Sequence, residues 1–378
     1  MDNHAKVQLL GDASEFDVDC GGSSSARQRH GLDRSISHVM LPGGRRTRLL
    51  KVLQSNVCEN DCAYCAIRAS RDVQRTAFSP DELAGCFDQM HRAGLVDGLF
   101  LSSGICHNAI REMDRMIATV EIVRTRHQFS GYVHLKLLPG ATPDQVERAV
   151  QLGDRVSINL EAPNAGRLSR LSARKDFGAE LMPPLRIASQ LIHTPDRPTK
   201  ASSVTTQFVV GAAGESDHEI LHTSAQLYQN LGLARTYYSA FTPIPDTPLA
   251  QHDPTPPLRQ HRLYQSDFLM RQYGFEFREL VFDSGGNLPA ECDPKMAWAR
   301  AHPESFPVEV NRASRHALLR VPGIGPVVAN RILRERQRGK LTDLSHLRKM
   351  GAVVSKVAEY VLLDGRRPAY QMPLWGAD

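Results

Sequence analysis

Short apolar runs alternate with amphipathic stretches through most of the chain. Runs of mainly apolar residues predict buried strands, because a strand that is covered on both faces is apolar throughout. Stretches whose apolar positions recur every three or four residues predict helices between them. The predicted strands are residues 49–53, 96–101, 132–138, 156–160, 204–210 and 236–241. The predicted helices are residues 80–93, 108–127, 143–152, 180–192, 217–231 and 258–273, the first with Ser79 as its N-cap.

Six strands that alternate with helices indicate an α/β domain whose parallel sheet is covered by helices on its outer face. We expect a partial (β/α)6 barrel of the TIM type over residues 46–285. A doubly wound open sheet is the alternative, which the absence of a Gly-x-Gly-x-x-Gly turn after the first strand disfavours. The polar residues 1–45 are expected to be a mostly irregular leader that packs on the barrel.

The alternation stops after Gly285 and Gly286, and residues 286–378 predict a separate all-α domain with a helix over 294–301. Between residues 311 and 349, ten lysines and arginines stand against two acidic residues, although the whole chain carries a net charge of only +5. Such a basic segment suggests a polyanionic partner, or simply a solvated helical face.

Composition places the protein in a reducing compartment. There is no run of eighteen apolar residues, and the first ten residues lack the pattern of a signal peptide, so we expect a cytoplasmic protein without a membrane segment. The seven cysteines are an odd number and make a poor disulfide framework for 378 residues. The cysteines therefore indicate metal binding or reactive thiols.

Three of the cysteines, Cys58, Cys62 and Cys65, follow the first predicted strand with three and then two residues between them. Iron–sulfur clusters generally take four thiolates, so a three-cysteine loop would leave one iron of a [4Fe–4S] cluster open to a small molecule. A zinc knuckle without its fourth ligand and simply buried cysteines are the alternatives. The nearest histidine, His91, has no zinc-finger spacing.

The Cys-x-x-x-Cys-x-Tyr-Cys loop, with Tyr64 before its last cysteine, resembles the radical S-adenosylmethionine (SAM) superfamily. The resemblance implies that the open iron binds the amino and carboxylate groups of SAM. It further implies that an electron, supplied by a donor such as flavodoxin or ferredoxin, cleaves SAM to a 5′-deoxyadenosyl radical that abstracts a substrate hydrogen.

In a barrel of this type the ligand lies at the carboxyl ends of the strands. Ser102, Ser103 and Gly104 occupy the place of the family's Gly-Gly-Glu stretch, without its acid. Ser157, Asn159 and Glu161 alternate along the fourth predicted strand and share one face, which points either into the pocket or outward. By resemblance, Lys175 would pair with the methionyl carboxylate, and the region of Gln207 and Gly211 would contact the adenine.

A second motif lies in the basic segment. Residues 318–333 read as a helix, a Gly323-Ile324-Gly325 hairpin and a second helix, and Arg331 follows on that second helix. A hairpin of this kind presents backbone N–H groups to phosphate. The stretch closely resembles the helix-hairpin-helix motif, which grips a nucleic-acid backbone, and residues 347–361 around Gly351 are a weaker echo of it. The alternative is that the motif serves only packing or protein contact.

Residues 12–20, 99–105, 237–240 and 293–299 extend the resemblance to one group, the radical SAM proteins of DNA modification or repair with a C-terminal helix-hairpin-helix. We therefore expect hydrogen abstraction from DNA or RNA. The alternatives are a cyclase of the nucleoside-antibiotic type, which acts on a free nucleotide, and a non-catalytic iron–sulfur sensor that binds nucleic acid. Cys106 and Tyr238 are weak catalytic candidates, and Cys20 matches the family leader without an assignable role.

Overall fold

The computed structural model describes residues 1–15, 34–40, 44, 46–106, 108–196 and 199–369. Within these residues seven strands form one curled sheet in strictly sequential order. The strands are β1 (Ile36–Met40), β2 (Arg46–Leu53), β3 (Gly98–Ser102), β4 (Tyr132–Lys136), β5 (Arg155–Ser157), β6 (Val204–Val210) and β7 (Arg235–Ala240). All neighbours are parallel except β1, which pairs antiparallel with β2.

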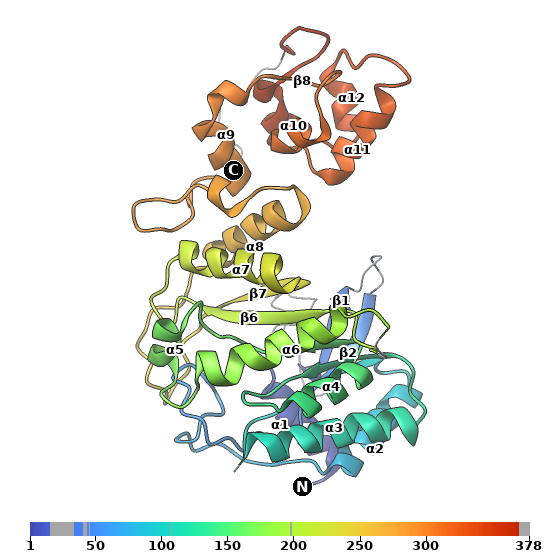
Figure 1. The fold of residues 1–378 in the computed structure, drawn as a ribbon, viewed down its shortest axis with the longest axis vertical. Helices are drawn as coiled ribbons and strands as arrows, with labels where there is room; N and C mark the ends of the chain where they lie inside the picture. The colour runs from blue at the N-terminus through green and yellow to red at the C-terminus, as the bar shows by residue number, and fades with distance from the viewer. Residues whose placement is uncertain (16–33, 41–43, 45, 107, 197–198, 370–378) are drawn as a thin grey trace. The chain divides into compact units, whose positions relative to one another are not determined.

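Helices cover the outer face of this sheet (Figure 1). Two of them begin with reciprocal capping boxes, Ser79 with Glu82 and Thr142 with Gln145, which fix where each helix starts. The helices between β2 and β7 are α2 (Pro80–Arg92), α3 (Ala109–Thr125), α4 (Pro143–Leu152), α5 (Ala165–Leu171), the π-helical Phe177–Leu181, α6 (Met182–His193) and α7 (Asp217–Leu231).

This arrangement confirms the predicted α/β partial barrel. A doubly wound sheet reverses its strand order at a switch point, whereas here every strand lies beside the next one in the sequence. The strands β3 and β6 are buried along their whole length, as expected for strands covered on both faces. Because the strands β2 to β7 are parallel, their carboxyl ends all lie at the same end of the barrel.

The leader differs from the irregular segment that its composition predicts. Helix α1 (Asn3–Asp12) begins at the side chain of Asp2 and buries Val7 and Leu10, and β1 extends the sheet at the β2 edge. Neither element has a clear apolar period. Each is stabilised instead by the burial of a few residues against β2. Strand β5 is also shorter than predicted, ending at Ser157.

The described residues divide into two compact units, Met1–Glu215 with Gln226–Pro256, and Ser216–Ala225 with Pro257–Asp378. The second unit contains α8 (Pro257–Gln272), α9 (Pro294–Ala301), α10 (Arg315–Arg320), α11 (Pro326–Glu335), α12 (Leu344–Lys349) and α13 (Val354–Val357). Short 3-10 turns lie at Phe277–Glu279, Pro303–Ser305 and Ala358–Tyr360.

Its core is a cluster of aliphatic side chains from α10 to α13, with Leu318, Ile332, Leu347 and Val357 fully buried. The helical character is confirmed, but the unit is not all-α. Strands β8 (Val308–Glu309) and β9 (Val361–Leu362) pair in parallel, so the segment before α10 lies beside the segment after α13. Such two-residue strands carry no periodicity that a sequence could reveal.

Candidate active site

The cysteine loop joins β2 to α2 and is fastened to the loop that follows β3. Gly104 N–H donates to the Ser55 carbonyl (2.7 Å), and Glu59 N–H donates to the Ile105 carbonyl (2.8 Å). The Ile105 amide also lies 3.5 Å from Cys58 Sγ. A Cβ at Gly104 would lie 2.6 Å from the Val57 carbonyl oxygen, so only glycine permits this approach.

The far side of the loop is held by two charged side chains. The Arg75 guanidinium donates to the carbonyls of Asn56, Ile67, Arg68 and Arg71 at 2.6 to 3.0 Å. Asp61 accepts from the Ser172 hydroxyl (2.6 Å) and from the Ala173 amide (3.1 Å). An irregular loop has no regular backbone hydrogen bonds of its own, so these side-chain hydrogen bonds fix its conformation.

The three thiols line one pocket at the carboxyl ends of the strands. Burial raises the pKa of Cys62, and it raises the pKa of Cys65 to about 12. Lys175, close by, acts in the opposite direction on both thiols. In the part of the chain that the structure describes, no three His, Cys, Asp or Glu side chains converge on a single metal ion. Three thiolates on one loop suit a cluster that leaves one iron open, whereas a structural zinc site takes four ligands.

Most of the predicted cofactor-binding residues lie around this same pocket. They come from the cysteine loop, from the loop after β3, from the segment after β5, from the segment before the π-helix and from β6. The pocket is lined by Tyr64, Ser102, Ser103, Gly104, Asn159, Glu161, Lys175 and Gln207, together with Cys58, Cys62 and Cys65.

Glu161 and Lys175 form a buried ion pair in the pocket wall. Lys175 Nζ lies 3.1 Å from Glu161 Oε1 and 3.4 Å from the Tyr64 hydroxyl. Burial alone would lower the pKa of Lys175, but Cys62 and Glu161 outweigh it and hold that pKa above its ordinary value. Glu161 Oε2 is buried and has no hydrogen-bond partner, so one carboxylate oxygen is left for a ligand.

Glu161 also has a left-handed backbone, with φ of +65°. This conformation is costly for a residue with a Cβ. It is held by Glu161 N–H donating to the Gln207 carbonyl (2.9 Å) and by Val209 N–H donating to the Glu161 carbonyl (2.8 Å). The β6 strand thus fixes a strained residue whose side chain faces the pocket.

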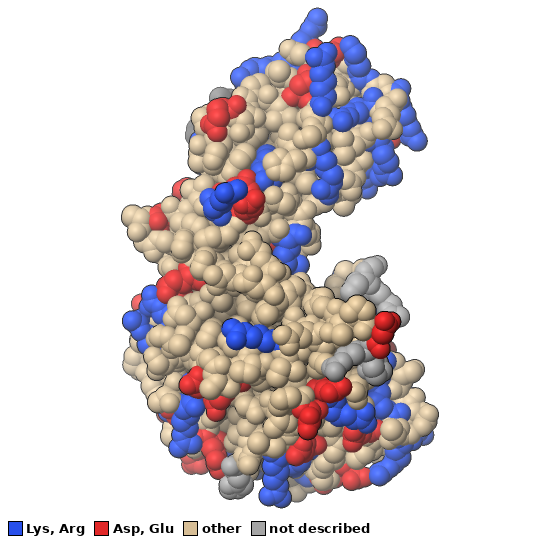
Figure 2. All heavy atoms as spheres, in the orientation of Figure 1, with Lys and Arg blue, Asp and Glu red and all other residues tan. Residues whose placement is uncertain are grey.

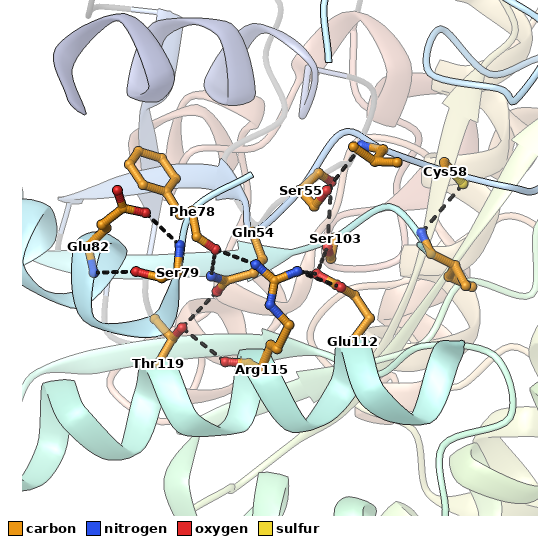
Figure 3. A network of polar contacts seen from close by, with 12 residues as sticks. Gln54, Ser55, Cys58, Phe78, Ser79, Glu82, Ser103, Glu112, Arg115 and Thr119 are labelled. Carbon is orange, nitrogen blue, oxygen red and sulfur yellow. Dashed lines mark hydrogen bonds and ion pairs between the residues drawn. The ribbon is translucent and has the colours of Figure 1, made fainter. Parts of the chain in front are cut away.

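A polar network lies behind the loop after β3 (Figure 3). The Ser103 hydroxyl donates to Glu112 Oε1 (2.9 Å), and Arg115 Nη1 lies 2.9 Å from Glu112 Oε2. Arg115 Nη2 donates to the Phe78 carbonyl (2.6 Å), which also accepts from Gln54 (2.8 Å). Because Ser103 donates its proton to Glu112, the lone pairs of its hydroxyl are left free to accept from a ligand in the pocket.

The remaining predicted residues lie elsewhere in the described structure. Ser157 bonds to the buried His134 ring (2.8 Å), and burial keeps the pKa of His134 well below its usual range. Gly211 donates to Glu215 in a turn with φ of +92°. Cys106 and Tyr238 are not among the pocket-lining residues, and the Tyr238 hydroxyl accepts from Thr236 (2.7 Å) in the core. Cys20 lies outside the described residues.

Several lining residues were not singled out from the sequence. They are Ala13 from the leader, Leu53, Asn60, Ala66 and Ile67, the run 136–139 at the end of β4, Ile158, Ile105, Val209 and the run 239–242 at the end of β7. Position at the carboxyl end of a barrel strand was the signal that could have found the runs at the ends of β4 and β7.

The hairpin Gly323-Ile324-Gly325 joins α10 to α11. Gly323 has a φ of +81°, and Ile324 is buried in the core of the unit. Arg331, on α11, is exposed and donates to the Met350 carbonyl (2.9 Å) beside Gly351. The structure thus brings the two glycine turns, Gly323 and Gly351, into one small unit.

Residues 52–227 match the radical SAM superfamily, and residues 305–360 match the helix-hairpin-helix motif. The chain carries a radical SAM domain. The family implies a [4Fe–4S] cluster and SAM as cofactors. The residues fit these groups, since three thiols stand beside an unpartnered carboxylate oxygen and a buried cation, a pair that complements an amino acid zwitterion.

Solved structures are similar to parts of this chain. HydG, a maturase of the [FeFe]-hydrogenase, matches with 13% identity over 60% of this chain and 52% of its own, at a TM-score of 0.43. Methylornithine synthase (PylB) matches with 14% identity over 58% of this chain and 60% of its own, at 0.46. The chain therefore spans between half and three fifths of the length of these two proteins. A comparison with curated proteins found no match. Among the described residues, no helix combines the length and apolarity needed to cross a bilayer.

Proposed function

We propose that this radical SAM enzyme abstracts a hydrogen atom from a sugar or base carbon of a nucleic acid, as a step in modification or repair. One observation carries the proposal. The chain combines the cysteine pocket with a helix-hairpin-helix motif, and in residues 311–349 of that motif ten lysines and arginines stand against two acidic residues. Phosphate neutralisation by such a unit is independent of sequence and suits a polymeric substrate.

The residues of the pocket have distinct tasks in this proposal. Cys58, Cys62 and Cys65 would hold the cluster, which supplies the electron that cleaves SAM to a 5′-deoxyadenosyl radical. Ser103 would accept a hydrogen bond from the amino group of SAM, with Glu112 holding the hydroxyl in that orientation. Lys175 and the free oxygen of Glu161 would bind the polar groups of the cofactor. The apolar Leu137, Ile158 and Val209 would keep water from the reacting atoms.

The deciding measurement is anaerobic formation of 5′-deoxyadenosine by the reduced, reconstituted protein, with duplex DNA, single-stranded DNA, RNA or a panel of free nucleotides added. Stimulation by a polymer alone supports the proposal. Stimulation by a mononucleotide alone contradicts it and indicates a nucleotide-tailoring enzyme. Absence of SAM cleavage under every condition would leave a nucleic-acid-binding sensor.

The cluster assignment is tested separately by Cys62→Ser with Cys86→Ser as the matched control. Both thiols are buried, but Cys86 lies in α2 and does not line the pocket. We expect Cys62→Ser to lose most of its iron and its visible absorbance, and Cys86→Ser to retain both. A full cluster in Cys62→Ser would contradict the assignment of the pocket.

A further inference from the structure

The basic residues nearest the Gly323–Gly325 hairpin are already engaged inside the C-terminal unit. Arg320 is almost fully buried, pairs with Glu279 at 2.7 Å, and lies 3.8 Å above the Phe275 ring. Lys356 pairs with Asp293 at 2.6 Å. These cations have carboxylate partners, so they contribute little net charge toward a phosphate at the hairpin.

The hairpin itself is packed against its own unit. A Cβ at Gly323 would lie 2.7 Å from the Val353 carbonyl oxygen, and the Val353 amide donates to the Gly323 carbonyl (3.2 Å). Lys295 Nζ donates to the Ile324 carbonyl (2.5 Å), and the Tyr273 hydroxyl would lie 3.2 Å from a Cβ at Gly325. The backbone therefore excludes a Cβ at Gly323, whereas a Cβ at Gly325 would require the Tyr273 side chain to move slightly.

Other cations gather elsewhere on the unit, over α11 and α12 (Figure 2). A hollow there is lined by Arg331, Arg334, Glu335, Arg338, Gly339, Lys340, Leu341, His346, Lys349 and Met350. Five of these residues are lysine or arginine and one is acidic. Arg331 is held at the rim by its bond to the Met350 carbonyl.

The cations of the ion pairs in this hollow are exposed to solvent. Arg338 pairs with Glu335 at 3.1 Å, and the Arg338 side chain is 78% exposed. Lys340 pairs with Asp364 at 2.9 Å, and the Lys340 side chain is 71% exposed. Exposed ion pairs contribute little to stability, so a phosphate can displace their carboxylates at little cost.

We propose that the phosphodiester backbone of a nucleic acid binds in this hollow between α11 and α12, and that the Gly323–Gly325 hairpin is a packing turn of the unit. The inference rests on the proposed function, because it assigns the surface that holds the polymer. It relocates the contact from the backbone amides of the predicted hairpin to side chains at the other end of α11.

Three variants of the full-length, reconstituted protein test this assignment. Arg334→Glu combined with Lys349→Glu reverses two charges in the hollow. Val327→Glu places a carboxylate in the first turn of α11, where the native side chain is 62% exposed and a negative charge favours the helix. Arg278→Glu is the matched control, because Arg278 lies in the same unit, is 81% exposed and does not line the hollow.

Binding is measured by fluorescence anisotropy with labelled duplex DNA, single-stranded DNA and RNA of mixed sequence over a range of salt concentrations. For each probe that the wild type binds, we expect the double variant to weaken binding at least tenfold and to reduce the slope of log Kd against log salt by about 2. We expect Val327→Glu and Arg278→Glu to bind as the wild type does. Circular dichroism checks that each variant is folded.

The outcomes separate the inference from the function on which it rests. If Val327→Glu loses binding while the double variant retains it, the hairpin is the contact and the inference is wrong, although nucleic-acid binding stands. Equal losses in both variants also overturn it. If the wild type binds no DNA and no RNA at any salt concentration, the proposed function itself fails.

Discussion

Glu112 is a carboxylate that the fold buries behind the pocket, with 2% of the residue exposed. It accepts from Ser103 and pairs with Arg115. Removing one member of a buried ion pair leaves the other charge uncompensated. The orientation of Ser103 and the anchoring of Arg115 at Phe78 therefore both depend on this single side chain.

We predict that Glu112→Gln lowers the free energy of unfolding by about 2 kcal/mol or more, measured by urea denaturation of the apoprotein. Glu121→Gln, on the same helix, removes an exposed pair with Arg148 and should cost less than about 1 kcal/mol. Equal effects of the two substitutions would show that the buried network adds no stability. SAM binding by equilibrium dialysis should weaken only in Glu112→Gln.

Sequence periodicity could not have found Glu112. A charged residue near the start of a helix normally faces solvent or the helix dipole, and only the approach of Ser103 and Arg115 makes this one internal. The same holds for the pairing of Glu161 with Lys175, since the register of a loop after β5 is set by β6. The cysteines, in contrast, were predicted because their chemistry lies in one short segment.

At the scale of elements, the pocket depends on how closely the loops after β2 and β3 approach each other. Gly104 is the contact point, since a Cβ there would lie 2.6 Å from the Val57 carbonyl oxygen and 3.1 Å from Cys58 Cβ. One of these neighbours is a backbone atom and the other belongs to a cysteine of the pocket. Neither can move aside as the end of a flexible side chain could.

We predict that Gly104→Ala displaces the cysteine loop, destabilises the protein by about 1–3 kcal/mol and lowers its iron and sulfide content after reconstitution. Gly85→Ala is the control, because Gly85 lies in α2 with open space around it and should gain about 0.5–1 kcal/mol. Normal iron content in Gly104→Ala would mean that the two loops can separate without loss of the site.

The elements themselves were largely predictable, and the exceptions have a common cause. Apolar runs and helical periods gave the strands β2 to β7 and the helices α2, α3, α4, α6 and α7, because each of those elements buries a continuous face. The seven-residue helix α5 was not predicted. Helix α1, strand β1 and the β8–β9 pair bury only a few residues each against neighbours distant in sequence. Their stability comes from tertiary contact, which no local pattern encodes.

At the scale of the whole molecule, stability should depend on pH through the C-terminal unit. Lys295 is buried, and burial lowers its pKa to about 7 from the ordinary value of 10.5. Asp293 raises that pKa and Arg320 lowers it, while the Tyr273 ring lies 4.8 Å away. Between pH 7 and about 10 the unfolded chain binds a proton that the folded chain does not, so stability rises with pH in this window.

We predict that Lys295→Met removes this rise. The difference in thermal midpoint between variant and wild type should be largest near pH 7 and below, where the buried lysine is charged in the wild type, and should shrink toward pH 10. Differential scanning calorimetry at several pH values measures it. A difference that is constant with pH would contradict a neutral Lys295 in the folded protein.

The sequential order of the sheet also has a consequence for how the protein is made. Each strand from β2 to β7 pairs with the next one in the sequence, so a nascent chain can add strands in the order of synthesis. The three cysteines follow β2, whereas Gln207 and Ser239 of the opposite wall belong to β6 and β7. About 170 residues separate Cys65 from Ser239. At a synthesis rate of roughly 5–20 residues per second, the three cysteines leave the ribosome roughly 10–30 s before β7 does. During this interval the pocket is still open on the side of β7, so the cell's iron–sulfur delivery machinery can reach the thiols.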